Sequence, residues 1–310
     1  MTSLICGSLA YDTIMSFEGR FAEALLADQL HKINVAFLVP AMRREFGGCA
    51  GNIAYNLQLL GGDPLIMATV GQDSTPYLKR LALQGISTRC VRTIDDAWTA
   101  QAFITTDADS NQITAFHPGA MTFSQLNTVA QAGPIKLAIV APDGRDGMLQ
   151  HARDCVALEI PFVFDPGQGL PMFSGAELRD FIALATYVAV NDYEAELLTE
   201  RTGLSLAQIA TQVDALVVTR GENGAEIHVN GELLEIPPVP VEVIIDPTGC
   251  GDAFRAGMLY GLSHNLDWPT IGRLSSLMGS IKIAHQGGQN HAPSRADIDE
   301  RFMAAFGYRF

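Results

Sequence analysis

Short apolar runs that end in turn or acidic residues recur along this chain, with helical stretches between them. "KLAIVAPDG", "PFVFDPG", "TYVAVND" and "ALVVTRG" are four such runs, and "SLICGSL" near the start is another. Runs of this kind are typical of strands buried on both faces, and their alternation with helices predicts a mostly parallel sheet covered by helices. We therefore expect an α/β fold whose ligand site lies beyond the carboxyl ends of the strands.

Two regions interrupt this alternation. Residues 13–45 contain no clean strand–helix unit, and residues 97–118 predict a hairpin with turn chemistry at "DADSN". We expect these two pieces to pair into a small β-rich lid, although a pair of ordinary surface hairpins is the alternative. The large α/β domain then comprises the remaining segments, 1–12, 46–96 and 119–310.

Charge and cysteine content restrict the partners and the compartment. The 310 residues carry a net charge of −14, which argues against a nucleic-acid partner and against an anionic membrane surface. The five cysteines are scattered and form no C-x-x-C pair, which argues against a disulfide framework or a cysteine zinc site. The start of the chain lacks the pattern of an export signal, and no apolar run is long enough for a membrane span. The cytoplasm is the expected compartment.

The stretch "DPTGCGDAF" holds the strongest chemical signal. Gly249, Cys250 and Gly251 carry little or no side chain, so backbone N–H groups and the start of the following helix can form an anion hole. A carboxylate at Asp252 beside such a hole can accept a proton from an attacking hydroxyl. This arrangement suits phosphoryl transfer to an alcohol. The alternative is a glycine-rich turn in which Asp252 is a plain helix N-cap.

Four motifs in one order resemble the PfkB (ribokinase-like) family of carbohydrate and nucleoside kinases. "DPTGCGD" is similar to the family's C-terminal signature, and "GGCAGNIAYNLQLLGG" (47–62) to its N-terminal signature. "NDYE" (191–194) resembles the N-x-x-E motif, and "VVTRGENGA" (217–225) resembles the nucleotide loop. The resemblance implies a three-layer α/β/α domain with a mostly parallel sheet, a small β-rich lid and kinase activity with ATP and Mg²⁺.

The resemblance also implies roles for individual residues. Asp252 would be the general base, and the amides of residues 249–251 would hold the γ-phosphate. Asn191 and Glu194 would order magnesium through water, with helix capping as the alternative. The ATP loop would be shaped by Thr219, Gly221 and Gly224, which otherwise are turn residues. A monovalent cation such as K⁺ would lie near Asp246, Thr248 and "AHQGGQ", although these residues can equally be structural.

For the acceptor, the chain is similar to bacterial adenosine kinases of the mycobacterial type over "GSLAYDTIMSFEGRFAEALLADQLHKINVAFLV" and "PGAM". This implies transfer to the 5′-hydroxyl of adenosine to give AMP, as in purine salvage. The nucleoside contacts would be Ser8, Asp12, Gly48, Asn52, Phe103, Phe116 and Gln168. Two departures, Ala36 in place of a serine and Gly169 in place of a glutamine, remove polar groups and can relax the choice of base.

Several alternatives stay open at this stage. A related kinase acting on another nucleoside, or on a sugar such as ribose or fructose, differs in whether Phe103 and Phe116 both face the cleft. A non-catalytic sensor that retains the fold predicts loss of the base or the anion hole. Gly47 and Gly48 are placed as a hinge for the lid or only as a tight turn. The free edge of the lid predicts a homodimer, and Arg255 is either a phosphate contact or a solvated helix residue.

Overall fold

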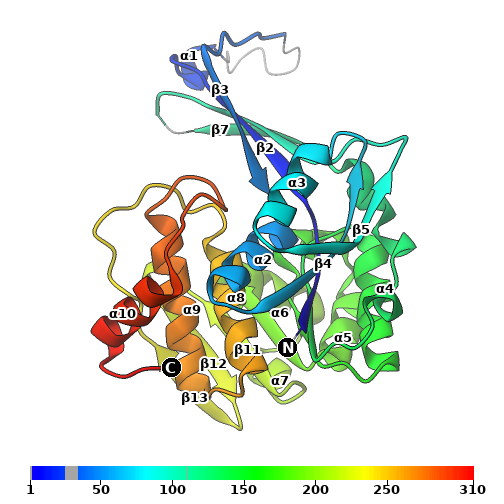
Figure 1. Ribbon diagram of the computed structural model, residues 1–310, viewed down its shortest axis with the longest axis vertical. Coiled ribbons are helices and arrows are strands. Elements are labelled where there is room, and N and C mark those ends of the chain that lie inside the picture. Colours follow the sequence, from blue (N-terminus) through cyan, green and yellow to red (C-terminus); the bar gives the residue numbers. More distant parts are fainter. Residues whose placement is uncertain (1, 25–33, 110) are drawn as a thin grey trace.

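The computed structural model describes residues 2–24, 34–109 and 111–310, which form a large α/β body and a projecting four-stranded sheet (Figure 1). The large sheet has the order β13-β12-β11-β10-β9-β8-β1-β4-β5, and β12 alone runs antiparallel to its neighbours. Its strands are β1 (Thr2–Cys6), β4 (Asp63–Gly71), β5 (Ser87–Ile94), β8 (Leu137–Val140), β9 (Phe162–Phe164), β10 (Tyr187–Asn191), β11 (Ala215–Thr219), β12 (Ala225–Val229) and β13 (Glu232–Ile236).

Helices cover both faces of this sheet. One face carries α2 (Cys49–Leu59), α3 (Thr75–Leu83), α8 (Cys250–Ser263), α9 (Trp268–Ile283) and α10 (Arg295–Phe306). The other carries α4 (Arg145–Ala157), α5 (Gly175–Leu184), α6 (Asp192–Thr202) and α7 (Leu206–Ala210). The short helical turns are η2 (Gly119–Leu126), η3 (Val129–Ala132), η4 (Gly167–Met172) and η5 (Gly221–Asn223), and α1 (Phe21–Ala24) lies near the small sheet.

Each central strand contributes side chains to two separate cores. Ile5 and Val217 lie in the core under α2, α8 and α9, whereas Leu4 and Val218 lie in the core under α4, α5 and α6. This alternation follows from the period of two along a strand, and it explains why the strands read as unbroken apolar runs. The three-layer α/β/α architecture that the sequence predicts is therefore confirmed.

The two irregular regions do form one lid sheet, made of β2 (Ala10–Ser16), β3 (Ala41–Gly47), β6 (Ala100–Thr106) and β7 (Gln112–His117). Strands β2 and β6 pair in parallel, and this pairing joins two antiparallel hairpins. The alternative of two separate surface hairpins is wrong. Ala10 and Gly47 extend the lid sheet into segments that the sequence assigned to the large domain. Within the predicted lid region 13–45, residues 25–33 lie outside the described residues.

The order in which strands are added to the large sheet reverses at β1. Strands β4 and β5 follow on one side of β1, and β8 to β11 follow on the other. Such a switch point opens a crevice at the carboxyl ends of the strands, where ligands of α/β proteins bind. The lid sheet projects from this same region, at the top of Figure 1. None of the helices in the described ranges combines the length and hydropathy that a membrane span requires.

Candidate active site

The amino ends of α2 and α8 meet at the switch point of the sheet. After β1, the Ser8 amide donates to the carbonyl of Pro142 (3.0 Å), which follows β8. The Ser8 hydroxyl accepts the amide of Cys49 (3.2 Å), and the Ser8 carbonyl accepts that of Ala50 (3.0 Å), so Ser8 anchors the start of α2. Two helix amino ends therefore point at one small region, which favours a negatively charged ligand there.

Asp252 lies inside the first turn of α8 and is not its cap. The N-cap is Gly249, whose φ of 78° is in the left-handed region, and the helix begins at Cys250. The Asp252 Oδ2 atom accepts a hydrogen bond from the Nδ2 atom of Asn52 (2.8 Å), a residue of α2. The alternative that Asp252 only caps the helix is wrong, because its carboxylate faces another helix.

The glycine-rich turn leaves two amides available to an anion. The Cys250 amide donates to the Pro247 carbonyl (3.1 Å), so it serves the turn itself. Within the described residues, the Gly249 and Gly251 amides have no backbone acceptor, and no atom comes within 4 Å of where a Cβ on Gly251 would lie. The predicted contribution of Cys250 to the anion hole is thus not supported by this geometry, whereas that of the two glycines is.

Two carboxylates near this turn have a raised pKa because of burial. Burial raises the pKa of Asp252 to about 6; the hydrogen bond from Asn52 acts against this rise, and the carboxylate of Asp165 adds to it. Burial, with the nearby carboxylates of Asp246 and Glu45, also raises the pKa of Asp12 to about 6. A carboxylate with such a pKa is largely ionised near neutral pH and is basic enough to take a proton.

Arg255 forms a buried ion pair that the sequence did not reveal. Its Nε and Nη2 atoms donate to the two carboxylate oxygens of Asp165, at 3.2 Å each, and both side chains are almost fully buried. The alternative of a solvated Arg255 is wrong. The pair joins α8 to the loop after β9, and the acidic residue at the end of "PFVFDPG" was the one sequence signal for it.

The loop after α9 closes the site from the C-terminal side. Asp246 accepts the amides of Thr248 (2.9 Å) and Gly287 (2.8 Å), and these bonds lower the pKa of Asp246 overall although burial alone raises it. The buried Lys282 ammonium donates to the carbonyls of Asp246 (2.6 Å) and His285 (3.0 Å). Asp246 and Thr248 therefore hold the loop together, which is the structural alternative to a cation site.

Asn191 and Glu194 cap α6 reciprocally. The Asn191 side chain accepts the Glu194 amide (2.7 Å), and Glu194 Oε2 accepts the Asn191 amide (2.8 Å). Burial raises the pKa of Glu194, and the charges of Asp165 and Arg255 act on it too, so it lies close to the Arg255–Asp165 pair. Over the described ranges, no three His, Cys, Asp or Glu side chains form a cluster that could hold a metal ion.

The residues predicted for the ATP loop follow β11. Gly221 (φ 53°) and Gly224 (φ 81°) both adopt left-handed conformations, and a Cβ on Gly224 would overlap the backbone of Ile236. Thr219 ends β11, and its hydroxyl donates weakly to the Val190 carbonyl (3.4 Å). Beside the anion hole in the chain, the apolar segment 243–245 is more than half exposed, a feature that the sequence analysis overlooked.

On the acceptor side, the structure brings Asp12, Gly48 and Asn52 to the joint between β3 and α2. Gly48 has a φ of 86°, and a Cβ there would lie 2.5 Å from the Ser8 carbonyl oxygen, so no other residue fits without moving the backbone. Asn52 is 4% exposed and uses its amide on Asp252 and on Gln289. The sequence analysis did not foresee its hydrogen bond to Asp252.

Phe103 and Phe116 lie on opposite faces of the lid sheet. Phe116 pairs with Ala102, which pairs with Asp12, so these three side chains share one face. Phe103 pairs with Thr13 and Ala115 and points to the other face. The expectation that both rings line one cleft is wrong for a single chain. Phe116 is on the side of Asp12, and Phe103 is not.

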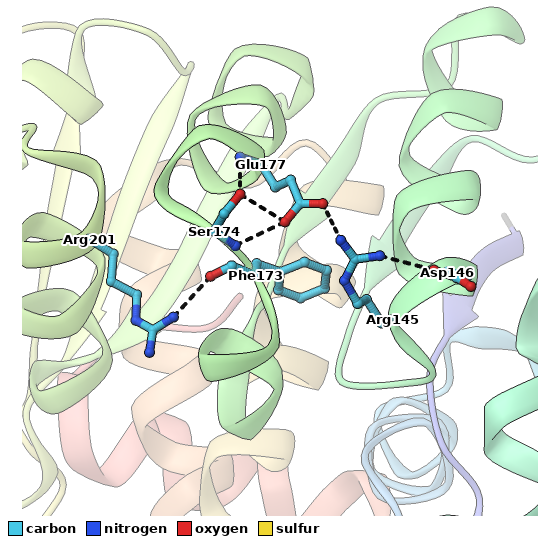
Figure 2. A network of polar contacts seen from close by, with 6 residues as sticks. All are labelled: Arg145, Asp146, Phe173, Ser174, Glu177 and Arg201. Carbon is cyan, nitrogen blue, oxygen red and sulfur yellow. Dashed lines mark hydrogen bonds and ion pairs between the residues drawn. The ribbon is translucent and has the colours of Figure 1, made fainter.

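A polar network holds the chain just after η4, the turn that contains Gln168 (Figure 2). Arg201 donates to the carbonyl of Phe173 (2.9 Å), just after η4, and Ser174 and Glu177 form a capping box. Arg145 pairs with Glu177 and with Asp146, and so ties α4 to α5. Gln168 is exposed on this anchored segment.

The two departures from the adenosine kinase pattern have different surroundings. At Gly169, an added Cβ would lie 3.1 Å from Met172 Cε and 3.6 Å from Met148 Sδ, so methionine side chains surround this position. Ala36 is exposed. Gly169 itself offers no polar side chain to a ligand.

The family profile described as pfkB family carbohydrate kinase matches residues 20–295. The chain belongs to the pfkB family of carbohydrate kinases. Among curated relatives of this kinase, the nucleoside kinase of Methanocaldococcus jannaschii is 28% identical over 305 residues, covering 97% of each chain. The family predicted from the four motifs is therefore confirmed.

Solved structures agree with this assignment. The Burkholderia thailandensis nucleoside kinase in complex with inosine is 60% identical, with a TM-score of 0.91 and 99% of each chain covered. The same protein in complex with ADP-inosine is 61% identical, with a TM-score of 0.88 over 99% of this chain and 97% of that one. Ribokinase from Thermotoga maritima (18% identical, TM-score 0.80, covering 98% and 99%) shares the fold, which is thus ribokinase-like.

Proposed function

We propose that this kinase transfers the γ-phosphoryl group of ATP to the 5′-hydroxyl of purine nucleosides, inosine and adenosine among them, as in purine salvage. The observation that carries the proposal is the position of Asp252, whose half-buried carboxylate lies in the same helical turn as the free amides of Gly249 and Gly251. Asp252 takes the hydroxyl proton while the oxygen–phosphorus bond forms, and the two amides stabilise the negative charge of the transferring group. The bond between the γ-phosphorus and the bridging oxygen breaks, and ADP leaves.

The residues around the turn are suited to ATP with hydrated magnesium. In the described residues, one carboxylate oxygen of Glu194 makes no hydrogen bond, and it lies near Arg255. A single free carboxylate suits Mg²⁺, which keeps several of its waters. Bound ATP and magnesium would supply the phosphoryl group and neutralise its charge; Thr219, Gly221 and Gly224 would shape the nucleotide loop. Each oxygen of Asp246 accepts one amide and keeps further lone pairs, so K⁺ beside Asp246 and Thr248 stays a prediction.

The choice of purines rests on two points. The Burkholderia thailandensis relative is described in complex with inosine, and it is 60% identical over nearly the whole chain. In this chain, Gly169 and its methionine neighbours offer no polar group where the adenosine kinase pattern has a glutamine. Fewer polar contacts discriminate less between 6-amino and 6-oxo purines. The nucleoside would lie between Asp12, Asn52, Phe116 and Gln168, with Ser8 and Gly48 shaping the joint.

A substrate panel tests this proposal. ATP- and magnesium-dependent turnover is measured with adenosine, inosine, guanosine, cytidine, ribose and fructose, and 5′-deoxyinosine serves as the control that lacks the acceptor hydroxyl. We expect the highest kcat/KM for purine nucleosides and no turnover of the deoxy compound. A preference for ribose or fructose, or phosphorylation of 5′-deoxyinosine, would contradict the proposal.

We further propose that two copies pair through the outer face of the lid sheet, the face that Phe103 shares. Met42 (70% exposed), Phe103 (40%) and Ile113 (43%) lie on this face according to the strand register. Exposed apolar side chains gathered on one face of a sheet mark an interaction surface. Sedimentation of the wild type and of Met42→Lys tests this: a dimer that the lysine weakens supports it, and a monomeric wild type contradicts it.

A further inference from the structure

A continuous chain of hydrogen bonds joins the lid sheet to Asp252. The Tyr77 hydroxyl on α3 donates to the carbonyl of Gly47 (2.6 Å), the last residue of β3. Gln289 Nε2 donates to Tyr77 Oη (2.7 Å) and to Asn52 Oδ1 (3.1 Å). Asn52 Nδ2 then donates to Asp252 Oδ2 (2.8 Å). The relay brings together β3, α2, α3, α8 and the loop after α9.

The direction of every hydrogen bond in the relay is fixed from its two ends. The Gly47 carbonyl can only accept, so Tyr77 must donate to it and can only accept from Gln289. Gln289 therefore turns its amide NH₂ toward both neighbours, and Asn52 turns its oxygen toward Gln289. This leaves the Asn52 NH₂ facing Asp252, whose ionised carboxylate can only accept. A flipped Asn52 would place two acceptors against each other at Asp252 and two donors at Gln289.

The relay is enclosed, so water cannot easily replace its members. Tyr77, Gln289 and Asn52 are 0%, 1% and 4% exposed. A Cβ on Gly51 would overlap the Tyr77 hydroxyl, and a Cβ on Gly288 would overlap Asn52 Oδ1. Glycines at these two positions therefore allow the polar groups to approach one another. Buried hydrogen bonds of this kind have stronger orienting power than exposed ones.

The side-chain oxygen of Gln289, Oε1, is buried and has no hydrogen-bond partner in the described part of the chain. Burying an unpaired amide oxygen costs free energy, so the surroundings must favour the orientation in which Nε2 makes both contacts. Arg80 holds the backbone here by donating to the Gln289 carbonyl (2.6 Å).

The loop that carries Gln289 also contacts the lid strand directly. Asn290 Nδ2 donates to Glu45 Oε2 (2.8 Å), and Glu45 pairs with Asp12 across β2 and β3. The loop thus contacts β3 directly at Glu45 and indirectly at Gly47, through the Tyr77 hydroxyl. A displacement of β3 relative to the large domain would change both contacts at once.

We propose that Tyr77 and Gln289 are positioning residues for the catalytic base: their hydrogen bonds hold the Asn52 amide toward Asp252 and make this orientation depend on where β3 of the lid sheet lies. The base is then correctly oriented only when Gly47 is in place. This inference rests on the proposed function of Asp252. Neither residue touches the substrate in this account, and both act through Asn52.

The test compares Tyr77→Phe and Gln289→Met with Tyr55→Phe as the matched control. Tyr55 lies on α2, is nearly as buried as Tyr77, and donates its hydroxyl to the His291 carbonyl, outside the relay. For each full-length variant, kcat, the KM values for inosine and ATP, the thermal midpoint and the pH profile of kcat/KM are measured. The titratable and charged groups facing Asp252 come from every neighbouring element: Asp12, Cys49, Asp165, Cys250, Arg255 and Lys282.

We expect Tyr77→Phe to lower kcat about 10-fold while KM for ATP changes little, because only the orientation of the base is disturbed. The acid limb of the pH profile of kcat/KM should move to higher pH, because a loosened Asn52 no longer stabilises the ionised carboxylate of Asp252. Tyr55→Phe should leave kcat and the pH profile unchanged. Gln289→Met should behave like Tyr77→Phe, and where it does not fold, Tyr77→Phe decides.

Two results would overturn the proposal. If Tyr77→Phe matches Tyr55→Phe in kcat and in pH profile, the relay does not position the base. If it lowers the thermal midpoint and kcat while the acid limb stays in place, its role is structural. A wild type that phosphorylates no nucleoside would contradict the proposed function, and the relay proposal would fall with it. If the wild type is active and Asp252→Asn is inactive, the proposed function stands, and the Tyr77→Phe result decides on the relay.

Discussion

Asn52 on α2 donates a hydrogen bond of 2.8 Å to Asp252 on α8, although 200 positions separate the two residues in the chain. The bond stabilises the ionised form of a carboxylate whose pKa is raised by burial. Base strength at Asp252 is thus a balance between burial and one amide. The predictions below follow from this balance and from the groups around it.

The rate should depend on pH through the raised pKa of Asp252. A general base acts in its ionised form, so kcat/KM for inosine should fall as the pH decreases through about 6 rather than through 3.8. Asp12, a proposed nucleoside contact, titrates in the same range, so a reaction that needs both carboxylates ionised gives a steeper limb than one group does. Asp12→Asn should make the limb shallower. An acid limb of kcat/KM near pH 4 would show that burial does not raise the pKa of Asp252.

The same shift has a consequence for stability. Because the folded-state pKa of Asp252 lies above the ordinary value of 3.8, the folded protein binds this proton more tightly than the unfolded chain does. The contribution of the group to the free energy of unfolding therefore decreases as the pH rises from about 4 to about 6. Urea unfolding of the wild type and Asp252→Asn across this range should show a difference that grows with pH in favour of the variant, on the order of 2 kcal/mol.

The two glycines of the anion hole should respond differently to alanine. Gly249 has a φ of 78°, so Gly249→Ala should lower the free energy of unfolding by about 1–2 kcal/mol and reduce kcat. Gly251 lies within α8 with open space around it, so Gly251→Ala should raise stability by about 0.5–1 kcal/mol. Its methyl group should nevertheless crowd the phosphate and lower kcat. Full activity in Gly251→Ala would argue against phosphate binding at this turn.

The buried pair of Arg255 and Asp165 should be sensitive to loss of one partner. Asp165→Asn leaves a buried guanidinium without its counter-charge and should cost about 3–5 kcal/mol. The control is Asp299→Asn, which removes an exposed partner of Arg295 one helical turn away and should cost about 0.5 kcal/mol or less. Equal costs in chemical denaturation would mean that the buried pair contributes no more than a surface pair.

The strand register separates the roles of the two lid aromatics. Phe116→Ala should raise KM for the nucleoside about 10-fold through lost apolar and stacking contact, because Phe116 shares a face with Asp12. In monomeric protein, Phe103→Ala should change KM much less. Steady-state kinetics test this at protein concentrations below the dissociation constant of any dimer. Equal effects of the two variants on KM would contradict the assignment of faces.

The sequence predicts the layers of the fold well because its signals are local. Apolar runs such as "KLAIVAPDG" identify strands buried on both faces, and the glycine-rich "DPTGCGD" identifies an anion-binding turn by its composition alone. The family motifs then predict that Asp252 is the base. These features depend on neighbours within a few positions of the chain.

Features that depend on pairing between distant elements could not be predicted in the same way. The opposite faces of Phe103 and Phe116 follow from the register between β6 and β7, and a shift of one residue would have placed them together. Arg255 meets Asp165 at a separation of 90 positions, and Gln289 meets Asn52 at 237. Nothing in the local sequence of Arg255 or Gln289 distinguishes a buried polar partner from a surface residue.

The most direct measurement is ATP-dependent phosphorylation of inosine and adenosine by the wild type and by Asp252→Asn, with thermal midpoints measured alongside. The variant keeps the shape of the side chain and removes only its basicity. We predict that the wild type forms the 5′-monophosphates, and that the variant loses at least about 10³-fold in kcat while remaining folded. A folded Asp252→Asn variant with near-normal kcat would contradict the assignment of Asp252 as the base and, with it, the central claim about this site.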